Sequence, residues 1–238
     1  METKKRNEMI EDVDKFEDAQ ENLVQWGIPF KVLFKSKFAL FFISFLFSHY
    51  LLTFRQLAKS NHVLDVGCGM GLPIKCLRRL GLSAQFIGVD IYAHYLKKVK
   101  KSGFYGDCVL ANVKFLPFRH NSFDSVMCFQ VLEHLSQRDG IIALDSLSDV
   151  AGTVVLTTPV GFIENNVDSS NVFQDHQSGW HPRDLRALGY KVRGYGGVGV
   201  GRIVSFKPFF LFNVFFAPLL IYCPMLALHM FAVKKARK

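Results

Sequence analysis

Along residues 61–207, short continuous apolar runs alternate with segments whose apolar residues recur every three or four positions. The first pattern is typical of buried strands and the second of amphipathic helices, so their alternation predicts a parallel sheet with crossover helices. The predicted strands are 62–66, 85–89, 122–129, 153–158, 190–194 and 201–206, and the predicted helices are 72–80, 93–101, 135–150 and 183–188.

The flanking segments have a different character. Residues 1–26 are polar with sparse apolar positions, which predicts an amphipathic helix. Residues 38–54 and 208–233 carry no charged side chain, and the second run is followed by a basic tail. The sequence therefore predicts three parts: an N-terminal cover segment (1–60), a central domain (61–207) and a hydrophobic C-terminal segment (208–238).

Two interpretations of the uncharged segments remain open. Both can pack on the central domain as cover helices. Alternatively, they can dock on a membrane surface as a shallow hairpin flanked by basic residues. The second run is long enough to span a bilayer, but Pro218 and Pro224 divide it. Phe-rich stretches flanked by basic residues favour a cytoplasmic protein with peripheral membrane contact.

Composition narrows the function further. The chain has 238 residues, which suits one full-sized α/β domain. Its five cysteines are widely spaced and form no Cys/His cluster, so neither a disulfide framework nor a metal site is predicted. The net charge is +9, and residues 1–26 are acidic, so the basic charge lies on the remainder. A basic body can attract anionic lipid, acidic substrates or nucleic acid, or be merely solvated. Nucleic acid is disfavoured because no RNA-binding module is recognisable.

The strongest chemical signal is the segment VLDVGCGMG at 63–71. An apolar strand ends beside an acidic residue and enters three glycines at alternate positions. Glycine tolerates positive φ and lets a ligand approach the backbone, so this turn forms a cradle of main-chain amides. The G-x-G-x-G spacing, with Asp65 two residues before the first glycine, suits a cationic cofactor with an amino-acid end better than a pyrophosphate. A second acidic residue, Asp90, ends the next strand, where it can bind ribose hydroxyls or cap the next helix.

Two further segments carry a family resemblance. LPFRHNSFDSV at 116–126 leads to VLEHL at 131–135, in the order and spacing of the earlier motifs. The sequence resembles the class I S-adenosylmethionine-dependent methyltransferases of the type 11-like group. The resemblance implies a Rossmann-like, seven-stranded, mostly parallel sheet with one antiparallel strand and helices on both faces. Here it would carry hydrophobic helical additions at both ends.

The resemblance also implies a cofactor site at the C-terminal strand edges. Asp65, Gly67, Cys68, Gly69 and Gly71 would surround the methionine portion of S-adenosylmethionine, and Asp90 would hold the ribose. The adenine would lie near Ile91, Asn112 and Val113, and Gln130 would line the cleft. The family usually has Asp where this chain has Asn112, which makes nearby Asp107 a fallback for the adenine contact.

The acceptor side is less defined. A long loop after the strand at 153–158 ends in HQSGWHP (176–182) and resembles a subgroup of methyltransferases with H-x-S-G-W. His134, His176 and Trp180 are predicted to bind the acceptor. Alternatively, Trp180 anchors the loop, His176 bonds to the backbone, and Glu133 and His134 only support a helix start. No catalytic base is predicted.

A small or lipid-like methyl acceptor is expected. Three rival functions remain: a non-catalytic binding module associated with membrane, an RNA-directed methyltransferase and a nicotinamide-dependent oxidoreductase.

Overall fold

The computed structural model describes residues 48–164, 171–198 and 220–236, and all of them belong to one compact unit that begins at residue 45. The α-helices are α4 (Ser48–Leu57), α5 (Leu72–Arg79), α6 (Ala93–Val99), α7 (Gln137–Val150) and α8 (Pro182–Ala187). The strands are β1 (His62–Val66), β2 (Gln85–Asp90), β3 (Asp107–Leu110), β4 (Phe123–Phe129), β5 (Ala151–Pro159), β6 (Lys191–Val198) and β7 (Ala227–Lys235). Short 3-10 turns are η1 (Lys100–Ser102), η2 (Leu132–His134), η3 (Val172–Gln174) and η4 (Pro224–Leu226).

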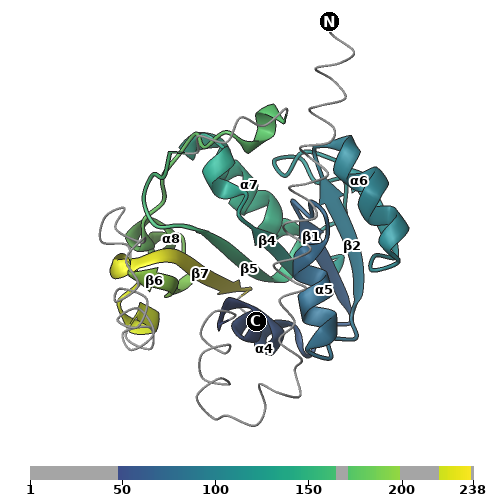
Figure 1. Cartoon of the computed structure of the whole chain (residues 1–238), viewed down its shortest axis with the longest axis horizontal. Coiled ribbons are helices and arrows are strands. Elements are labelled where there is room, and N and C mark those ends of the chain that lie inside the picture. Colours follow the sequence, from purple (N-terminus) through teal and green to yellow (C-terminus); the bar gives the residue numbers. More distant parts are fainter. Residues whose placement is uncertain (1–47, 165–170, 199–219, 237–238) are drawn as a thin grey trace, which may run out of the picture. The chain divides into compact units, whose positions relative to one another are not determined.

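The seven strands form one sheet in the order β3-β2-β1-β4-β5-β7-β6 (Figure 1). Strands β1 to β5 pair in parallel, and β7 is antiparallel to both of its neighbours. The predicted Rossmann-like, mostly parallel sheet is thus confirmed. The carboxyl ends of the five parallel strands meet at one edge, which is where ligands bind in sheets of this kind.

Helices cover both faces of the sheet, and the alternation of side chains explains which residues meet them. Along β1, Val63 belongs to the buried cluster that includes residues of α4, α5 and α6, whereas Leu64 belongs to the cluster that includes residues of α7 and α8. Successive residues of a strand point to opposite faces. A strand buried on both faces therefore needs the continuous apolar run seen in the sequence.

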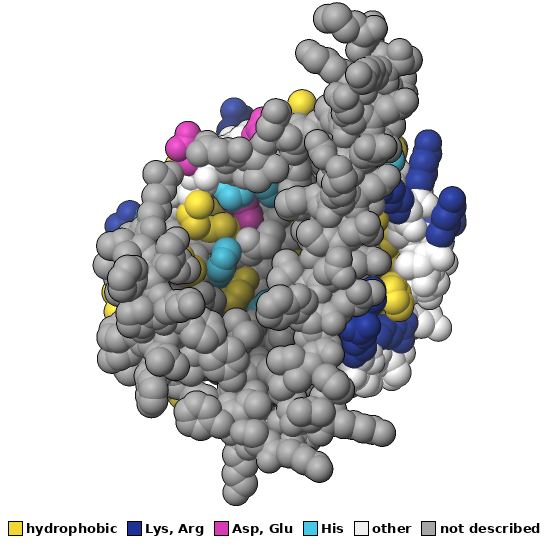
Figure 2. Space-filling model, viewed as in Figure 1, with side chains coloured by type: hydrophobic (Ala, Val, Ile, Leu, Met, Phe, Trp, Pro, Cys, Tyr) yellow, Lys and Arg dark blue, Asp and Glu magenta, His cyan; other side chains and the backbone are white. Residues whose placement is uncertain are grey.

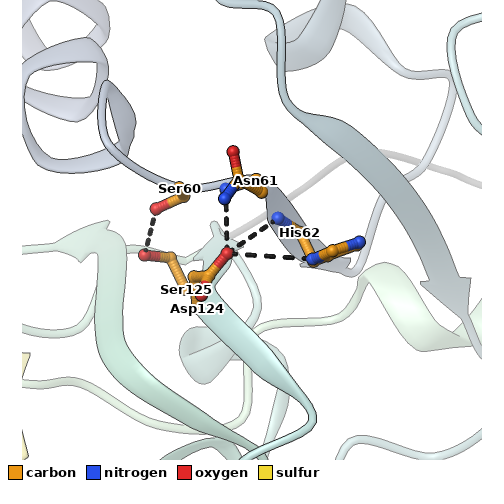
Figure 3. Close-up of polar contacts among 5 residues, drawn as sticks. All are labelled: Ser60, Asn61, His62, Asp124 and Ser125. Carbon is orange, nitrogen blue, oxygen red and sulfur yellow. Dashed lines mark hydrogen bonds and ion pairs between the residues drawn. The ribbon is translucent and has the colours of Figure 1, made fainter.

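Polar contacts fix β1 to β4 at the amino edge of the sheet (Figure 3). One carboxylate oxygen of Asp124 accepts hydrogen bonds from the backbone N–H groups of Asn61 and His62, at 2.8 and 2.9 Å. The hydroxyls of Ser60 and Ser125 are 2.8 Å apart. These contacts lie at the edge opposite the candidate site, so they hold the start of β1 without touching a ligand.

The C-terminal prediction is wrong in one respect. Residues 227–235 form a strand and not a helical addition, and this strand lies inside the sheet between β5 and β6. Long-range pairing decided this, because the apolar pattern of a strand buried on both faces cannot be distinguished from that of a buried helix. The 208–238 segment is therefore partly integral to the domain.

Other differences are smaller. Strand β3 was not predicted, and α7 begins at Gln137 because Ser136 caps it by accepting the N–H of Asp139. Helix α4 covers the sheet through buried Leu52 and Leu57, as the cover-helix interpretation expects. The predicted helix in 1–26 and strand at 201–206 lie outside the described residues. Within the described part of the chain, no helix combines the length and hydrophobicity needed to cross a bilayer.

Candidate active site

The glycine turn after β1 has the backbone conformation that its sequence predicts. Gly67, Gly69 and Gly71 have φ values of 72°, 49° and 77°, in the left-handed region that favours glycine. A Cβ on Gly67 would lie 2.3 Å from the side chain of Val131, whereas a Cβ on Gly69 would have no neighbour within 4 Å. The turn is therefore packed on one side and open at its tip.

Hydrogen bonds tie this turn to the end of β2. The N–H groups of Gly67 and Cys68 both donate to the carbonyl of Val89, at 2.8 and 3.0 Å. One carboxylate oxygen of Asp90 accepts the N–H of Gly69 at 2.9 Å, and the other accepts the N–H of Tyr92 at 2.8 Å. Burial raises the pKa of Asp90, and the hydrogen bonds from these backbone donors partly lower it. Asp90 thus joins the glycine turn to the start of α6.

Asp65 lies beneath the turn and is 1% exposed. Its carboxylate accepts a 2.6 Å hydrogen bond from the hydroxyl of Tyr105. Burial raises the pKa of Asp65 to about 7; the bond from Tyr105 lowers it, and the charge of Asp90 raises it. Tyr105 also fills the space that a Cβ on Gly71 or Gly88 would need. Sequence reasoning missed Tyr105, since it lies outside every recognised motif.

The predicted adenine side lies at the ends of β2 and β3. Ile91 is 39% exposed, and buried Val113 belongs to the core. The side-chain oxygen of Asn112 accepts the N–H of Lys114 at 3.0 Å. Asp107 stands at the start of β3, level with Ile87 and at the wrong end of the strand for this site. The parallel register thus separates Asp107 from Asp90, which argues against the fallback assignment.

Gln130 follows β4 with an unusual backbone. Its φ is 54°, which is rare for residues other than glycine and clusters at functional sites. Its side-chain amide donates to the hydroxyl of Thr157 at 3.1 Å, and its N–H donates to the Thr157 carbonyl at 2.9 Å. These bonds to β5 hold Gln130 at the carboxyl edge, where the sequence placed it.

Glu133 and His134 of η2 lie close to His176 of the later loop. A carboxylate oxygen of Glu133 and one ring nitrogen each of His134 and His176 all lie within 4.8 Å of one another. The two imidazole rings are edge to face, with centroids 4.9 Å apart. On the face seen in Figure 2, histidine side chains gather beside acidic ones. Because His176 lies far from Glu133 in the chain, spacing alone gave no sign of this group, and no metal site was predicted.

Burial and hydrogen bonds define the ionisation of this group. Glu133 is 2% exposed and accepts a 2.9 Å hydrogen bond from Thr158. Burial raises the pKa of Glu133 to about 7. Burial also lowers the pKa of His134, although the carbonyls of Asp175 and Gln174 act in the other direction.

Trp180 lies in the core instead of facing the site. It is 3% exposed, and its indole N–H donates to the carbonyl of Leu132 at 3.3 Å and to the hydroxyl of Ser178 at 3.0 Å. Its ring also covers Gly140 of α7. These contacts fit the loop-anchor interpretation, and they leave His176 as the predicted residue of this loop that reaches the site.

Comparison with known proteins agrees with this geometry. Residues 64–147, which run from β1 into α7, match the family model described as a methyltransferase domain. The fold is shared with solved S-adenosylmethionine-dependent enzymes. Residues 64–147 thus match a methyltransferase domain, within a fold like that of S-adenosylmethionine-dependent methyltransferases.

Several known proteins are similar to this domain in sequence or in fold. A ubiquinone biosynthesis O-methyltransferase of Xanthomonas euvesicatoria is 36% identical over 115 residues, which cover 46% of this chain and 47% of that protein. The chain thus spans about half the length of this curated relative. An S-adenosylmethionine-dependent methyltransferase of Archaeoglobus fulgidus shares the fold at 17% identity and a TM-score of 0.51, over 78% of this chain and 94% of the other. The structure of the small RNA methyltransferase HEN1 aligns at 15% identity and a TM-score of 0.56, over 80% of this chain and 25% of the other.

Proposed function

We propose that this protein transfers the methyl group of S-adenosylmethionine to a small or lipophilic acceptor. The observation that carries the proposal is the glycine turn, open at Gly69 and tied to β2 by the Asp90 carboxylate. A cofactor can approach the main-chain amides there, at the edge where parallel sheets bind ligands.

The residues at this edge fit the parts of S-adenosylmethionine. Asp65, Gly67, Cys68, Gly69 and Gly71 would surround the amino-acid end, where a carboxylate and backbone amides suit an ammonium and a carboxylate. The Asp90 carboxylate accepts backbone bonds from Gly69, Tyr92 and Ile91. A carboxylate offers about four acceptor positions, so one remains for a ribose hydroxyl. The adenine would pack on partly exposed Ile91, beside Asn112 and Val113.

The chemical demand on the protein is modest. When bound, S-adenosylmethionine supplies a methyl group already activated by its sulfonium. The side chains then mainly align the acceptor and exclude water. Gln130, held by Thr157, would define the floor between cofactor and acceptor. His134 and His176 lie on the acceptor side, where an imidazole can remove a proton from a hydroxyl.

An oxygen atom is the proposed site of methylation. The Xanthomonas relative is named an O-methyltransferase of ubiquinone biosynthesis. Apolar side chains near the candidate acceptor loops are exposed, including Phe162 (60%), Ile163 and Phe173. They suit a lipophilic phenol or quinol-like acceptor better than a polar one. Peripheral contact with a membrane would bring such acceptors within reach.

The first experiment is calorimetric titration of the full chain with S-adenosylhomocysteine, with NADH as the control ligand. Micromolar binding of S-adenosylhomocysteine and no binding of NADH is expected. Binding of NADH alone would overturn the proposal in favour of an oxidoreductase. Binding of neither ligand would favour a scaffold role.

Acceptor class is then tested with radiolabelled S-adenosylmethionine. Membrane extracts, small catechols and total RNA serve as separate acceptor pools, and label is expected in the first two. Label confined to RNA would contradict the lipophilic acceptor and support the alternative of an RNA-directed enzyme. Membrane contact is tested separately by flotation with anionic vesicles. The protein is expected to float with the vesicles at low salt and to sediment without them.

A further inference from the structure

We propose that Glu133, His134 and His176 bind one first-row divalent cation, of the zinc, cobalt or manganese type, on the acceptor side of the sheet edge. Each of the three residues offers one ligand atom, and these atoms all lie within 4.8 Å of one another. Two imidazoles and one carboxylate form the ligand set of several catalytic metal sites with open positions.

The buried carboxylate of Glu133 supports a cation. Glu133 is 2% exposed, and its carboxylate accepts a hydrogen bond from the neutral hydroxyl of Thr158. Among the residues that the structure describes, no lysine or arginine forms an ion pair with it. Buried carboxylates in proteins are generally protonated, paired with a cation or bound to a metal. A metal ion would supply the missing positive charge.

The hydrogen bonds of the two histidines orient them as ligands. The Nδ1 atom of His134 lies 3.3 Å from the carbonyl of Asp175, and that of His176 lies 2.5 Å from the carbonyl of Ile163. A carbonyl only accepts, so each neutral ring carries its proton on Nδ1, and His176 keeps its lone pair on Nε2. The carbonyl of Gln174 also contacts the His134 ring, and a metal ion would replace that contact. Metal-binding histidines commonly donate their second nitrogen to a backbone carbonyl in this way.

The geometry needs only a small contraction. Bonds from zinc to nitrogen or oxygen are about 2.0–2.2 Å, so ligand atoms on one tetrahedral ion stand roughly 3.3 Å apart. The backbone is already fixed close to this arrangement, because the N–H groups of Gln177 and Ser178 donate to the carbonyl of Glu133 at 2.7 and 3.2 Å. Side-chain rotation can therefore close the site without moving the sheet.

Three protein ligands leave coordination positions open. A substrate oxygen could occupy one of them and lose its proton more readily; this last point rests on the proposed function, whereas the metal site itself does not. Magnesium and calcium prefer all-oxygen ligands, so weaker binding of these ions is expected.

Calorimetry and the visible absorption spectrum of cobalt test the proposal. The full chain carries Cys223→Ser to remove an exposed thiol, is stripped with a chelator and is titrated with Zn²⁺, Co²⁺, Mn²⁺ and Mg²⁺. One equivalent of Zn²⁺ or Co²⁺ is expected to bind, with a cobalt spectrum typical of fewer than six ligands. His176→Ala and Glu133→Gln should each weaken binding at least ~10-fold.

The control is His120→Ala, which removes an exposed histidine before β4, near the opposite edge and should leave metal affinity unchanged. If Glu133→Gln fails to fold, His176→Ala on the loop still decides the question. Absence of binding in the wild type, or equal affinity in wild type and His176→Ala, would overturn the proposal. S-adenosylhomocysteine titration of the same samples separates loss of metal from loss of the cofactor site.

Discussion

Replacing Tyr105 by phenylalanine removes one hydroxyl whose energetic role can be read from its surroundings. That hydroxyl donates a 2.6 Å hydrogen bond to Asp65, which is 1% exposed. In the wild type, burial raises the pKa of Asp65 to about 7, above its ordinary 3.8. Ionised Asp65 therefore destabilises the native state, and the stability that the protonated group gives at low pH is lost as pH rises through about 7.

The loss from Tyr105→Phe should depend on pH. Near pH 5.5 Asp65 is protonated, and a neutral hydrogen bond of about 1 kcal/mol is lost. Near pH 8.5 Asp65 is ionised, and a bond to a charged group contributes about 1.5–3 kcal/mol. Without that bond the pKa of Asp65 rises further, by about one unit per 1.4 kcal/mol. The expected loss is about 1 kcal/mol at the lower pH and about 2–2.5 kcal/mol at the higher one.

Urea denaturation at both pH values, followed by circular dichroism, measures these losses. Tyr190→Phe is the matched control, because Tyr190 is a buried tyrosine whose hydroxyl makes no hydrogen bond to a carboxylate in the described part of the chain. Its loss should be small and equal at the two pH values. An equal loss for Tyr105→Phe at both pH values, or a larger loss at low pH, would refute the assignment of an ionising Asp65 beneath the glycine turn.

Three further predictions concern the cofactor site and its supports. Asp90→Ala should weaken S-adenosylhomocysteine binding by about 1.5–3 kcal/mol in calorimetry, whereas Asp124→Ala, which removes a carboxylate with two backbone donors at the other edge, should leave affinity unchanged. Asn112→Asp should strengthen S-adenosylhomocysteine binding by about 0.5–1.5 kcal/mol, because it adds charge to the acceptor atom, and Asn112→Ala should weaken that binding. The opposite order of affinities would exclude this contact. Gly140→Ala should lower the free energy of unfolding by about 1–3 kcal/mol, because the new Cβ would lie 2.4 Å from the Trp180 ring, which outweighs a helix-propensity gain of about 1 kcal/mol. A stabilised variant in thermal melts would contradict this last prediction.

The central sheet could be predicted because its signals are local. The apolar runs of β1, β2, β4 and β5 are bounded by turn residues. The glycines of 67–71 indicate a turn with positive φ values, which the structure has. The motif order then carried the family resemblance and the cofactor side of the site. Strand β7 was missed because its apolar run takes its identity from pairing with β5 and β6, and no neighbour in sequence reveals that pairing.

The candidate site was likewise predicted only where its residues belong to short local motifs. Asp65, Asp90 and the glycines were predicted from the sequence as cofactor-binding residues, since each lies near the end of a strand or in the turn that follows it. The contacts that surround the ionisable side chains of the site came from remote segments, and only the structure revealed them. They are Tyr105 with Asp65, Thr158 with Glu133, and His176 with His134. The sequence alone predicted most of the parallel strands, the helices between them and the expected class of cofactor, because these depend on periodicity and short motifs. The tertiary structure decided which charges are buried and what faces them, because burial and distance depend on the whole fold.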